Sequence, residues 1–394
     1  MKMKKLARVF TSAVLVSAMV ATMGGMTAFA EEQTVDITKT VTKEENVYAP
    51  KTDFKFKIEA GQPVAGSAGQ AEIKAGPMDK ISFDDAAKVE EETDENVKVG
   101  KISSVPDTER DIGHTSVIVG SAKIKINIDD FGSDKTYDYG IYRYKLTEME
   151  PDEKYEGVYY TKEEKNLDVY VYGPSKNASG EDVPGGVRFV ITGPDADAST
   201  GKDDGDFVNT YKDNNEDDPT HPVTGPKNLV ITKTVTGNQG VVNDEYAFSV
   251  KIDGAEGEWY YIVIENTEES DTRPVDVDVN RTALVSGQQY PVKLKGSQKA
   301  TIYGLTDTDK YTIEETDYSG SGYTTTINGT EGRTVTDVLN KQNEKIVDTT
   351  IAFVNDKDAT TPTGIVLSFA PYILLVALAG VFGVLFLRRR KEEF

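Results

Sequence analysis

The hexapeptide Ile37-Thr38-Lys39-Thr40-Val41-Thr42 recurs without change at residues 231–236. Both copies alternate between two sets of side chains with a period of two residues, which is typical of a β-strand with one buried face. Valine, isoleucine and threonine also favour strands. The repeat therefore predicts two strands at equivalent places in two related units.

Short runs rich in Val, Ile, Tyr and Thr, separated by Gly and Pro, fill residues 34–357, and helical periodicity is scarce. This pattern predicts an all-β protein with two tandem Ig-like β-sandwich domains. The polar, proline-containing stretch 212–227 (KDNNEDDPTHPVTGPK) is predicted to be a linker. It would separate an N-terminal domain of residues 31–211 from a C-terminal domain of residues 228–357.

Two further segments recur across this linker. Residues 207–209 (FVN) reappear at 353–355, and residues 144–148 (YKLTE) have a looser counterpart at 311–315 (YTIEE). Each domain is therefore expected to open on a strand with a lysine, to carry a glutamate strand late, and to close on a strand with an asparagine.

Strand alternation places these three polar side chains on the apolar, inward face of their strands. They are Lys39, Glu148 and Asn209 in the N-terminal domain, and Lys233, Glu315 and Asn355 in the C-terminal domain. Glu314 is adjacent to Glu315, but alternation favours Glu315.

A buried lysine tends to lose its charge and a buried glutamate tends to gain a proton. The neutral amine is a nucleophile, and the protonated acid can hydrogen-bond and polarise the asparagine carboxamide and shuttle protons. Attack of the amine on the carboxamide carbon would expel ammonia and leave an amide cross-link between the first and last strands. The alternative interpretation is a buried Lys-Glu ion pair with a hydrogen-bonded asparagine.

Residues 1–30 have the basic start, apolar core and small-x-small cleavage site of a secretory signal peptide. Cleavage is predicted after Ala30. The alternative is an N-terminal membrane anchor.

Residues 358–394 combine Thr361-Pro362-Thr363-Gly364, the apolar run Ile365–Leu387 and a basic tail. The run is long enough to span a bilayer, and the tail would stay cytoplasmic. Pro-Thr-Gly before such a run resembles a sortase sorting signal, which implies cleavage between Thr363 and Gly364. The missing leucine of the usual motif suggests a specialised sortase. The alternative is a plain membrane anchor.

The composition argues against several function classes. The chain of 394 residues carries 66 acidic and 44 basic side chains, a net charge of -22, which disfavours nucleic-acid binding. It has no cysteine and two histidines, so we expect no disulfide, no metal site, no cofactor and no enzyme active site. Asp195, Asp197 and Ser199 have the spacing of a calcium loop, but Gly201 is one place late, and a solvated acidic loop is favoured.

The chain resembles the two-domain major (backbone) pilins of Gram-positive bacteria, of the streptococcal T-antigen/FctA type. The resemblance rests on residues 50–59 (PKTDFKFKIE), residues 142–148 and the lysine and asparagine strands. It implies one Lys–Asn isopeptide bond per domain, joining Lys39 to Asn209 with Glu148 assisting and Lys233 to Asn355 with Glu315 assisting.

The resemblance also implies that a sortase joins Thr363 of one subunit to a lysine of the next. Lys202 lies at the family position shortly before the closing asparagine of the first domain. Lys176, in residues 171–177 (VYGPSKN), is the alternative, because this stretch partly matches another pilin motif.

The leading hypothesis is therefore the structural shaft subunit of a covalent pilus at the cell wall. Its expected partners are a class C-type pilin sortase, further copies of itself, minor or basal pilins, and peptidoglycan through basal anchoring, with the membrane a partner only before processing. The alternative is a singly anchored adhesin that binds a host protein or glycan.

Overall fold

The computed structural model describes residues 32–89, 94–194, 202–212, 227–268, 283–306, 308–339, 348–358 and 375–376. The predicted signal peptide, the candidate calcium loop, the sortase motif and nearly all of the predicted membrane span lie outside these residues. Within the described part of the chain, no helix has the length and hydropathy needed to cross a membrane.

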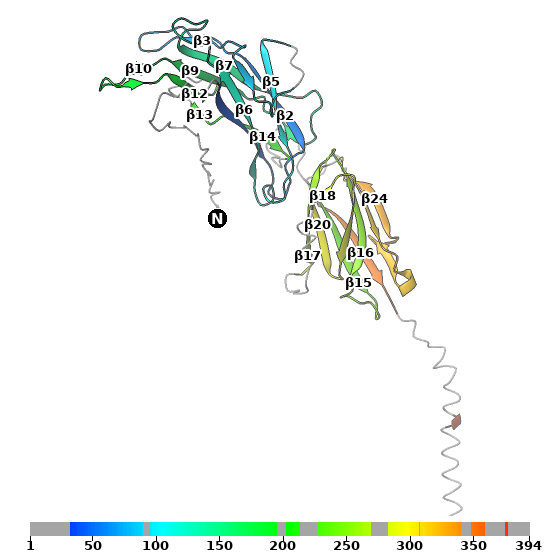
Figure 1. The fold of residues 1–394 in the computed structure, drawn as a ribbon. Coiled ribbons are helices and arrows are strands. Elements are labelled where there is room, and N and C mark those ends of the chain that lie inside the picture. The colour runs from blue at the N-terminus through cyan, green and yellow to red at the C-terminus, as the bar shows by residue number, and fades with distance from the viewer. Residues whose placement is uncertain are drawn as a thin grey trace, which may run out of the picture.

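The first unit, which precedes residue 213, contains two main sheets (Figure 1). One has the strand order β4-β6-β1-β14-β8. These strands are β4 (Ile81–Phe83), β6 (Ser116–Asn127), β1 (Glu32–Thr42), β14 (Asp206–Tyr211) and β8 (Val158–Tyr159).

The other sheet has the order β13-β12-β9-β7-β2-β5, and β3 pairs with β7. Its strands are β13 (Lys202–Asp203), β12 (Gly186–Thr192), β9 (Glu164–Tyr172), β7 (Gly140–Met149), β2 (Thr52–Ala60), β5 (Val97–Ser104) and β3 (Ile73–Ala75). A projecting hairpin is formed by β10 (Ser175–Lys176) and β11 (Asp182–Val183) (Figure 1).

The second unit, from residue 227 onward, also contains two sheets. The larger has the order β18-β17-β20-β15-β25-β22-β23, with strands β18 (Leu284–Val285), β17 (Trp259–Asn266), β20 (Gln298–Leu305), β15 (Lys227–Thr236), β25 (Thr349–Asp356), β22 (Thr324–Ile327) and β23 (Thr330–Glu331). The smaller has the order β19-β16-β21-β24, with strands β19 (Gln289–Leu294), β16 (Tyr246–Asp253), β21 (Lys310–Glu315) and β24 (Thr334–Val338). A 3₁₀ turn spans Ser319–Ser321.

Each unit has its own apolar core, built from the alternating inward side chains of its two sheets. In β16, for example, buried and half-buried residues alternate without a break from Tyr246 to Asp253. The predicted all-β fold of tandem sandwiches is confirmed. The exact domain boundaries remain a prediction.

The first and last strands of each unit lie side by side and run parallel. In the first unit β1 pairs with β14, with Val41 opposite Asn209. In the second unit β15 pairs with β25, with Val235 opposite Asn355. Since Lys39 and Lys233 precede these valines by two residues, each lysine lies on the same face as the asparagine and one pleat away from it.

A buried lysine links the two units. Lys212 follows β14, and its Nζ donates to a carboxylate oxygen of Glu258 and to the carbonyl of Gly304, both in the second unit. Lys212 is 1% exposed. Tyr48 of the first unit also packs edge-on against Trp259 of the second, with ring centroids 5.5 Å apart. We refer to these contacts as the inter-unit joint.

Candidate cross-linking sites

The first candidate site lies between the two sheets of the first unit. The Nζ of Lys39 lies 3.0 Å from Oε2 of Glu148, and Nδ2 of Asn209 donates to Oε1 of the same glutamate at 2.6 Å. Lys39 comes from β1 and Asn209 from β14 in one sheet, whereas Glu148 comes from β7 in the facing sheet. Lys39 and Asn209 are 0% exposed and Glu148 is 1% exposed.

Burial acts in opposite directions on the two ionisable groups of this site. It lowers the pKa of the Lys39 ammonium, although the charge and hydrogen bond of Glu148 oppose the change. It raises the pKa of the Glu148 carboxyl, again against the influence of Lys39. Both shifts favour a neutral amine beside a neutral carboxylic acid.

The second unit repeats this arrangement. Oε1 of Glu315 accepts from Nζ of Lys233 at 2.7 Å and from Nδ2 of Asn355 at 2.8 Å. All three residues are fully buried. Burial lowers the pKa of Lys233 to about 8 and raises the pKa of Glu315.

One atom distinguishes the second site. Oε2 of Glu315 is buried and has no hydrogen-bond partner among the residues that the structure describes. A buried, unpaired carboxylate oxygen is costly when ionised. This environment favours the protonated acid, the form that can give a proton to a leaving amine.

Aromatic rings surround each amine. Lys39 Nζ lies 4.8 Å from the centroid of the Phe54 ring, and Lys233 Nζ lies 4.6 Å from the centroid of the Tyr246 ring. Two residues further along the same strands, Phe56 packs edge-on against Phe207 and Phe248 against Phe353, with centroid separations of 5.0 and 5.1 Å. These rings keep the surroundings of the amine apolar, which is what lowers its pKa.

The sequence did not identify these rings as a repeat, although a signal was present. An aromatic-x-aromatic pair follows the lysine strand in both units: Phe54-x-Phe56 begins 15 residues after Lys39, and Tyr246-x-Phe248 begins 13 residues after Lys233. The sequences of the two units differ around this aromatic pair. The two pairs are therefore recognised as equivalent only from the strand topology that the units share.

The carboxamide oxygens of both asparagines also have hydrogen-bond donors that the sequence did not indicate. Oδ1 of Asn209 accepts from the backbone N–H and the hydroxyl of Thr161, at 3.2 and 3.1 Å. Oδ1 of Asn355 accepts from the hydroxyl of Thr325 at 2.8 Å.

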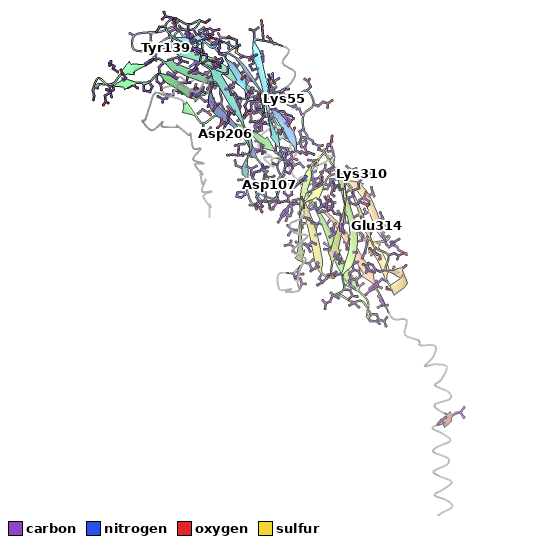
Figure 2. All side chains as sticks on the ribbon, in the orientation of Figure 1. Lys55, Asp107, Tyr139, Asp206, Lys310 and Glu314 are labelled. Atoms are coloured by element: carbon purple, nitrogen blue, oxygen red, sulfur yellow. The ribbon has the colours of Figure 1, made fainter. Side chains whose placement is uncertain are left out.

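Three other residues singled out in the sequence lie outside the two buried Lys-Glu-Asn sites: Glu314 and the two candidate intersubunit lysines. Glu314, labelled in Figure 2, is exposed on the outer face of β21. Lys202 begins β13 at the edge of its sheet, opposite Thr192. Lys176 lies on the β10–β11 hairpin, 3.0 Å from Asp182, and its side chain is 68% exposed.

The edge strand that carries Lys202 is held by buried charge. Oδ2 of Asp203 accepts from Nζ of Lys165 at 2.7 Å, and Lys165 also donates to Glu163 at 2.8 Å. Asp206, labelled in Figure 2, accepts from the hydroxyls of Thr38 and Thr40 on the outer face of β1. These bonds fix the backbone on both sides of the turn between β13 and β14.

Metal binding has no support in the described part of the chain. No group of three or more His, Cys, Asp or Glu side chains there is arranged to hold a metal ion. Asp195, Asp197, Ser199 and Gly201 are outside it.

Comparison with known proteins shows that the chain is similar to pilins. It is 25% identical over 369 residues to a pilin of Streptococcus pyogenes serotype M1, an alignment that covers 88% of this chain and 87% of that protein. The resemblance to the streptococcal pilins is therefore confirmed at the level of sequence. Residues 227–357 match the model of a domain of unknown function, DUF7601.

Solved pilin structures are also similar. The crystal structure of the major pilin from Streptococcus pyogenes covers 83% of this chain and 99% of that chain, with a TM-score of 0.43 and 20% identity. The major pilin T3.2 of the same species covers 84% of this chain and 99% of that chain, with a TM-score of 0.43 and 19% identity.

Proposed function

We propose that this protein is the structural shaft subunit of a sortase-assembled covalent pilus, and that each of its two sandwiches closes itself with a Lys–Asn isopeptide bond. One observation carries the proposal. In a chain similar to a pilin over most of its length, a buried Lys-Glu-Asn set joins the first and last strands of both units.

The proposed cross-link is an internal, single-turnover reaction, so the protein is not an enzyme. The neutral amine of Lys39 attacks Cγ of Asn209, the C–N bond to the carboxamide nitrogen breaks, and ammonia leaves. Glu148, as the neutral acid, gives its proton to the leaving nitrogen and takes back the proton that the attacking amine loses. Lys233, Asn355 and Glu315 perform the same steps in the second unit.

This bond suits a fibre that carries load. Lys39 lies in β1 and Asn209 in β14, so the amide would close a loop of nearly the whole first unit. Since the chain has no cysteine, disulfides cannot supply this constraint. The lysine–asparagine bond would connect the two chain ends of each unit directly, and the segments between them would be shielded from pulling force.

Assembly would use the two ends predicted from the sequence. After export and removal of residues 1–30, a class C-type pilin sortase would cut between Thr363 and Gly364. It would pass the carbonyl of Thr363 to a lysine of the next copy. Minor or basal pilins would then attach the polymer to peptidoglycan, and the cell surface would be the final location.

We propose Lys202 as the acceptor lysine, with Lys176 as the alternative. In support, Lys202 lies on the edge strand β13, and the next residue of this strand, Asp203, accepts a hydrogen bond from the buried Lys165. Binding of a lysine by an enzyme costs less conformational entropy when the adjacent backbone is already fixed than when it belongs to a free loop. Lys176 already has a carboxylate partner in Asp182.

Polymerisation tests this proposal. Cell-wall extracts of a strain that makes the protein and its sortase should contain an SDS-resistant ladder of high molecular weight. Lys202→Arg should collapse the ladder to monomer, and Lys176→Arg should leave it intact. The reverse result would identify Lys176 as the acceptor. A wild-type monomer bound only to peptidoglycan would contradict the shaft proposal and favour the adhesin.

A further inference from the structure

A threonine contacts the carboxamide oxygen of the asparagine at each candidate cross-link. In the first unit, Thr161 donates its backbone N–H and its hydroxyl to Oδ1 of Asn209. In the second unit, the hydroxyl of Thr325 donates to Oδ1 of Asn355. The contact therefore occurs twice, between unrelated stretches of sequence.

The backbone donor fixes which way the carboxamide points. Because an amide N–H can only donate, the group of Asn209 that faces Thr161 is the carbonyl oxygen. The NH₂ group then faces Glu148, at 2.6 Å. The glutamate accordingly touches the group that leaves, and the threonine touches the oxygen on which negative charge develops.

The two threonines occupy the same place in the topology. Thr161 follows β8, the strand that flanks β14 on the side away from β1. Thr325 lies in β22, which flanks β25 on the side away from β15, and it is directly opposite Asn355. In both units the donor thus comes from the strand beyond the closing strand or from the residues that directly follow it.

We propose that Thr161 and Thr325 are catalytic residues of cross-link formation, each acting as a one-residue oxyanion hole. This inference rests on the proposed isopeptide chemistry. As the lysine nitrogen bonds to Cγ, the carbonyl electron pair moves onto Oδ1, where the threonine donors stabilise it. When the carbonyl re-forms, the C–N bond to the NH₂ group breaks, and that nitrogen takes a proton from the glutamate and leaves as ammonia. The lysine nitrogen gives one proton to the glutamate in return and becomes the amide N–H.

The two sites should depend on the hydroxyl to different degrees. At Asn209, removal of the Thr161 hydroxyl still leaves the backbone N–H in place. The Thr161 hydroxyl is also shared with the carbonyl of Val208, at 3.1 Å. At Asn355, the Thr325 hydroxyl is the donor in a buried contact, and the hydrogen bonds described for Oδ1 include no backbone N–H. The Thr325 hydroxyl should therefore matter more.

The test follows ammonia loss by intact mass in the mature chain after a pulse of synthesis. Thr325→Val should slow the Lys233–Asn355 bond by about 10²–10³-fold, the usual effect of removing an oxyanion donor. Thr161→Val should slow the Lys39–Asn209 bond by no more than about tenfold, and Thr325→Ser should restore the wild-type rate. The bond of the unaltered unit is an internal reference in every sample.

Matched controls separate chemistry from folding. Thr147→Val removes a buried hydroxyl that has no hydrogen-bond partner among the described residues and lies next to Glu148. Thr326→Val alters the neighbour of Thr325 on the same strand. Both should cross-link at the wild-type rate. If Thr325→Val fails to fold by circular dichroism, Thr325→Ala removes the same hydroxyl with less steric change.

Two outcomes would overturn different claims. A wild-type chain that never loses ammonia would contradict the cross-link itself. A wild-type chain that loses two ammonia molecules, with folded Thr325→Val or Thr325→Ala reacting at the same rate, would leave the cross-link standing and refute the role of the threonine.

Discussion

At the scale of single residues, the position of the glutamate between amine and carboxamide decides the chemistry. Oε1 of Glu315 accepts from both Lys233 and Asn355, while its neighbour Glu314 is exposed. Only a buried carboxyl with a raised pKa can hold a proton at neutral pH and pass it to the leaving nitrogen.

Glu315→Gln should abolish the second cross-link, because a carboxamide cannot take and return the proton. Relative to the mass calculated from its own sequence, the purified mature chain should then lose one ammonia fewer than the wild type, and Glu148→Gln should have the same effect through the first unit. Glu314→Gln is the matched control and should lose as many ammonia molecules as the wild type, relative to the mass calculated from its own sequence. Loss of the bond in Glu314→Gln but not in Glu315→Gln would reverse the assignment.

An unlinked Lys233 should make the stability of the second unit depend on pH. In Asn355→Ala the amine stays free, with a folded pKa of about 8 against about 10.4 in the unfolded chain. Between these values the unfolded chain binds the proton that the folded chain has released, so the contribution of Lys233 to stability rises with pH.

Urea unfolding of Asn355→Ala and wild type at several pH values from 7 to 10 would measure this effect. In the wild type the nitrogen would be an amide that does not titrate. The difference in unfolding free energy between the two proteins should therefore shrink as the pH rises through this window. A constant difference would contradict a free amine in the variant and an amide in the wild type.

At the scale of strands, the parallel pairs β1–β14 and β15–β25 place lysine and asparagine on one face two residues out of register. Each cross-link would close a loop of more than a hundred residues. Chain-entropy arguments assign such a closure about 5 kcal/mol of stability.

Asn209→Ala should therefore lower the melting temperature of the first unit by about 10–20 °C, since 1 kcal/mol corresponds to about 2–4 °C in a unit of this size. Differential scanning calorimetry would show the shift, and the transition of the second unit should stay in place. Asn166→Ala changes a carboxamide that donates to the carbonyls of Gly193 and Pro194 and should have a much smaller effect. Equal shifts in the two variants would argue against a covalent closure.

Much of this arrangement could be predicted from the sequence, because the two-residue period of a strand shows which side chains lie on its buried face. The alternation of side chains in residues 35–41 predicts that Lys39 points into the core. The exact repeat at residues 231–236 identifies Lys233 as the equivalent residue of the second unit. Thr161 could not be found in this way. It follows a strand of two residues, β8, which has no periodic pattern, and only the order of strands in the sheet brings it to Asn209.

At the scale of the whole molecule, the inter-unit joint connects the two sandwiches through a buried charge. Lys212 contacts Glu258, and the rings of Tyr211 and Tyr260 lie 5.2 and 5.6 Å from its Nζ. The sequence placed Lys212 in a linker, because its neighbours are polar. Its burial depends on Glu258 and Gly304, which lie far along the chain and gave no local signal.

Lys212→Ala should loosen this joint, because it leaves Glu258 buried without its amine, a loss that typically costs about 3–5 kcal/mol. Small-angle X-ray scattering of the mature chain should show a larger radius of gyration and a broader distance distribution. Lys176→Ala removes the exposed ion pair with Asp182 and should leave both unchanged. Identical scattering from Lys212→Ala and wild type would show that the other contacts suffice.

The central claim is that each unit closes itself with an amide bond, and the intact mass of the purified mature chain tests it most directly. The mass should fall below the value calculated from the sequence by two molecules of ammonia. Peptide mapping should then recover Lys39 joined to Asn209 and Lys233 joined to Asn355. A mass equal to the calculated value, with all four residues in linear peptides, would contradict the account and leave two buried ion pairs in place of the cross-links.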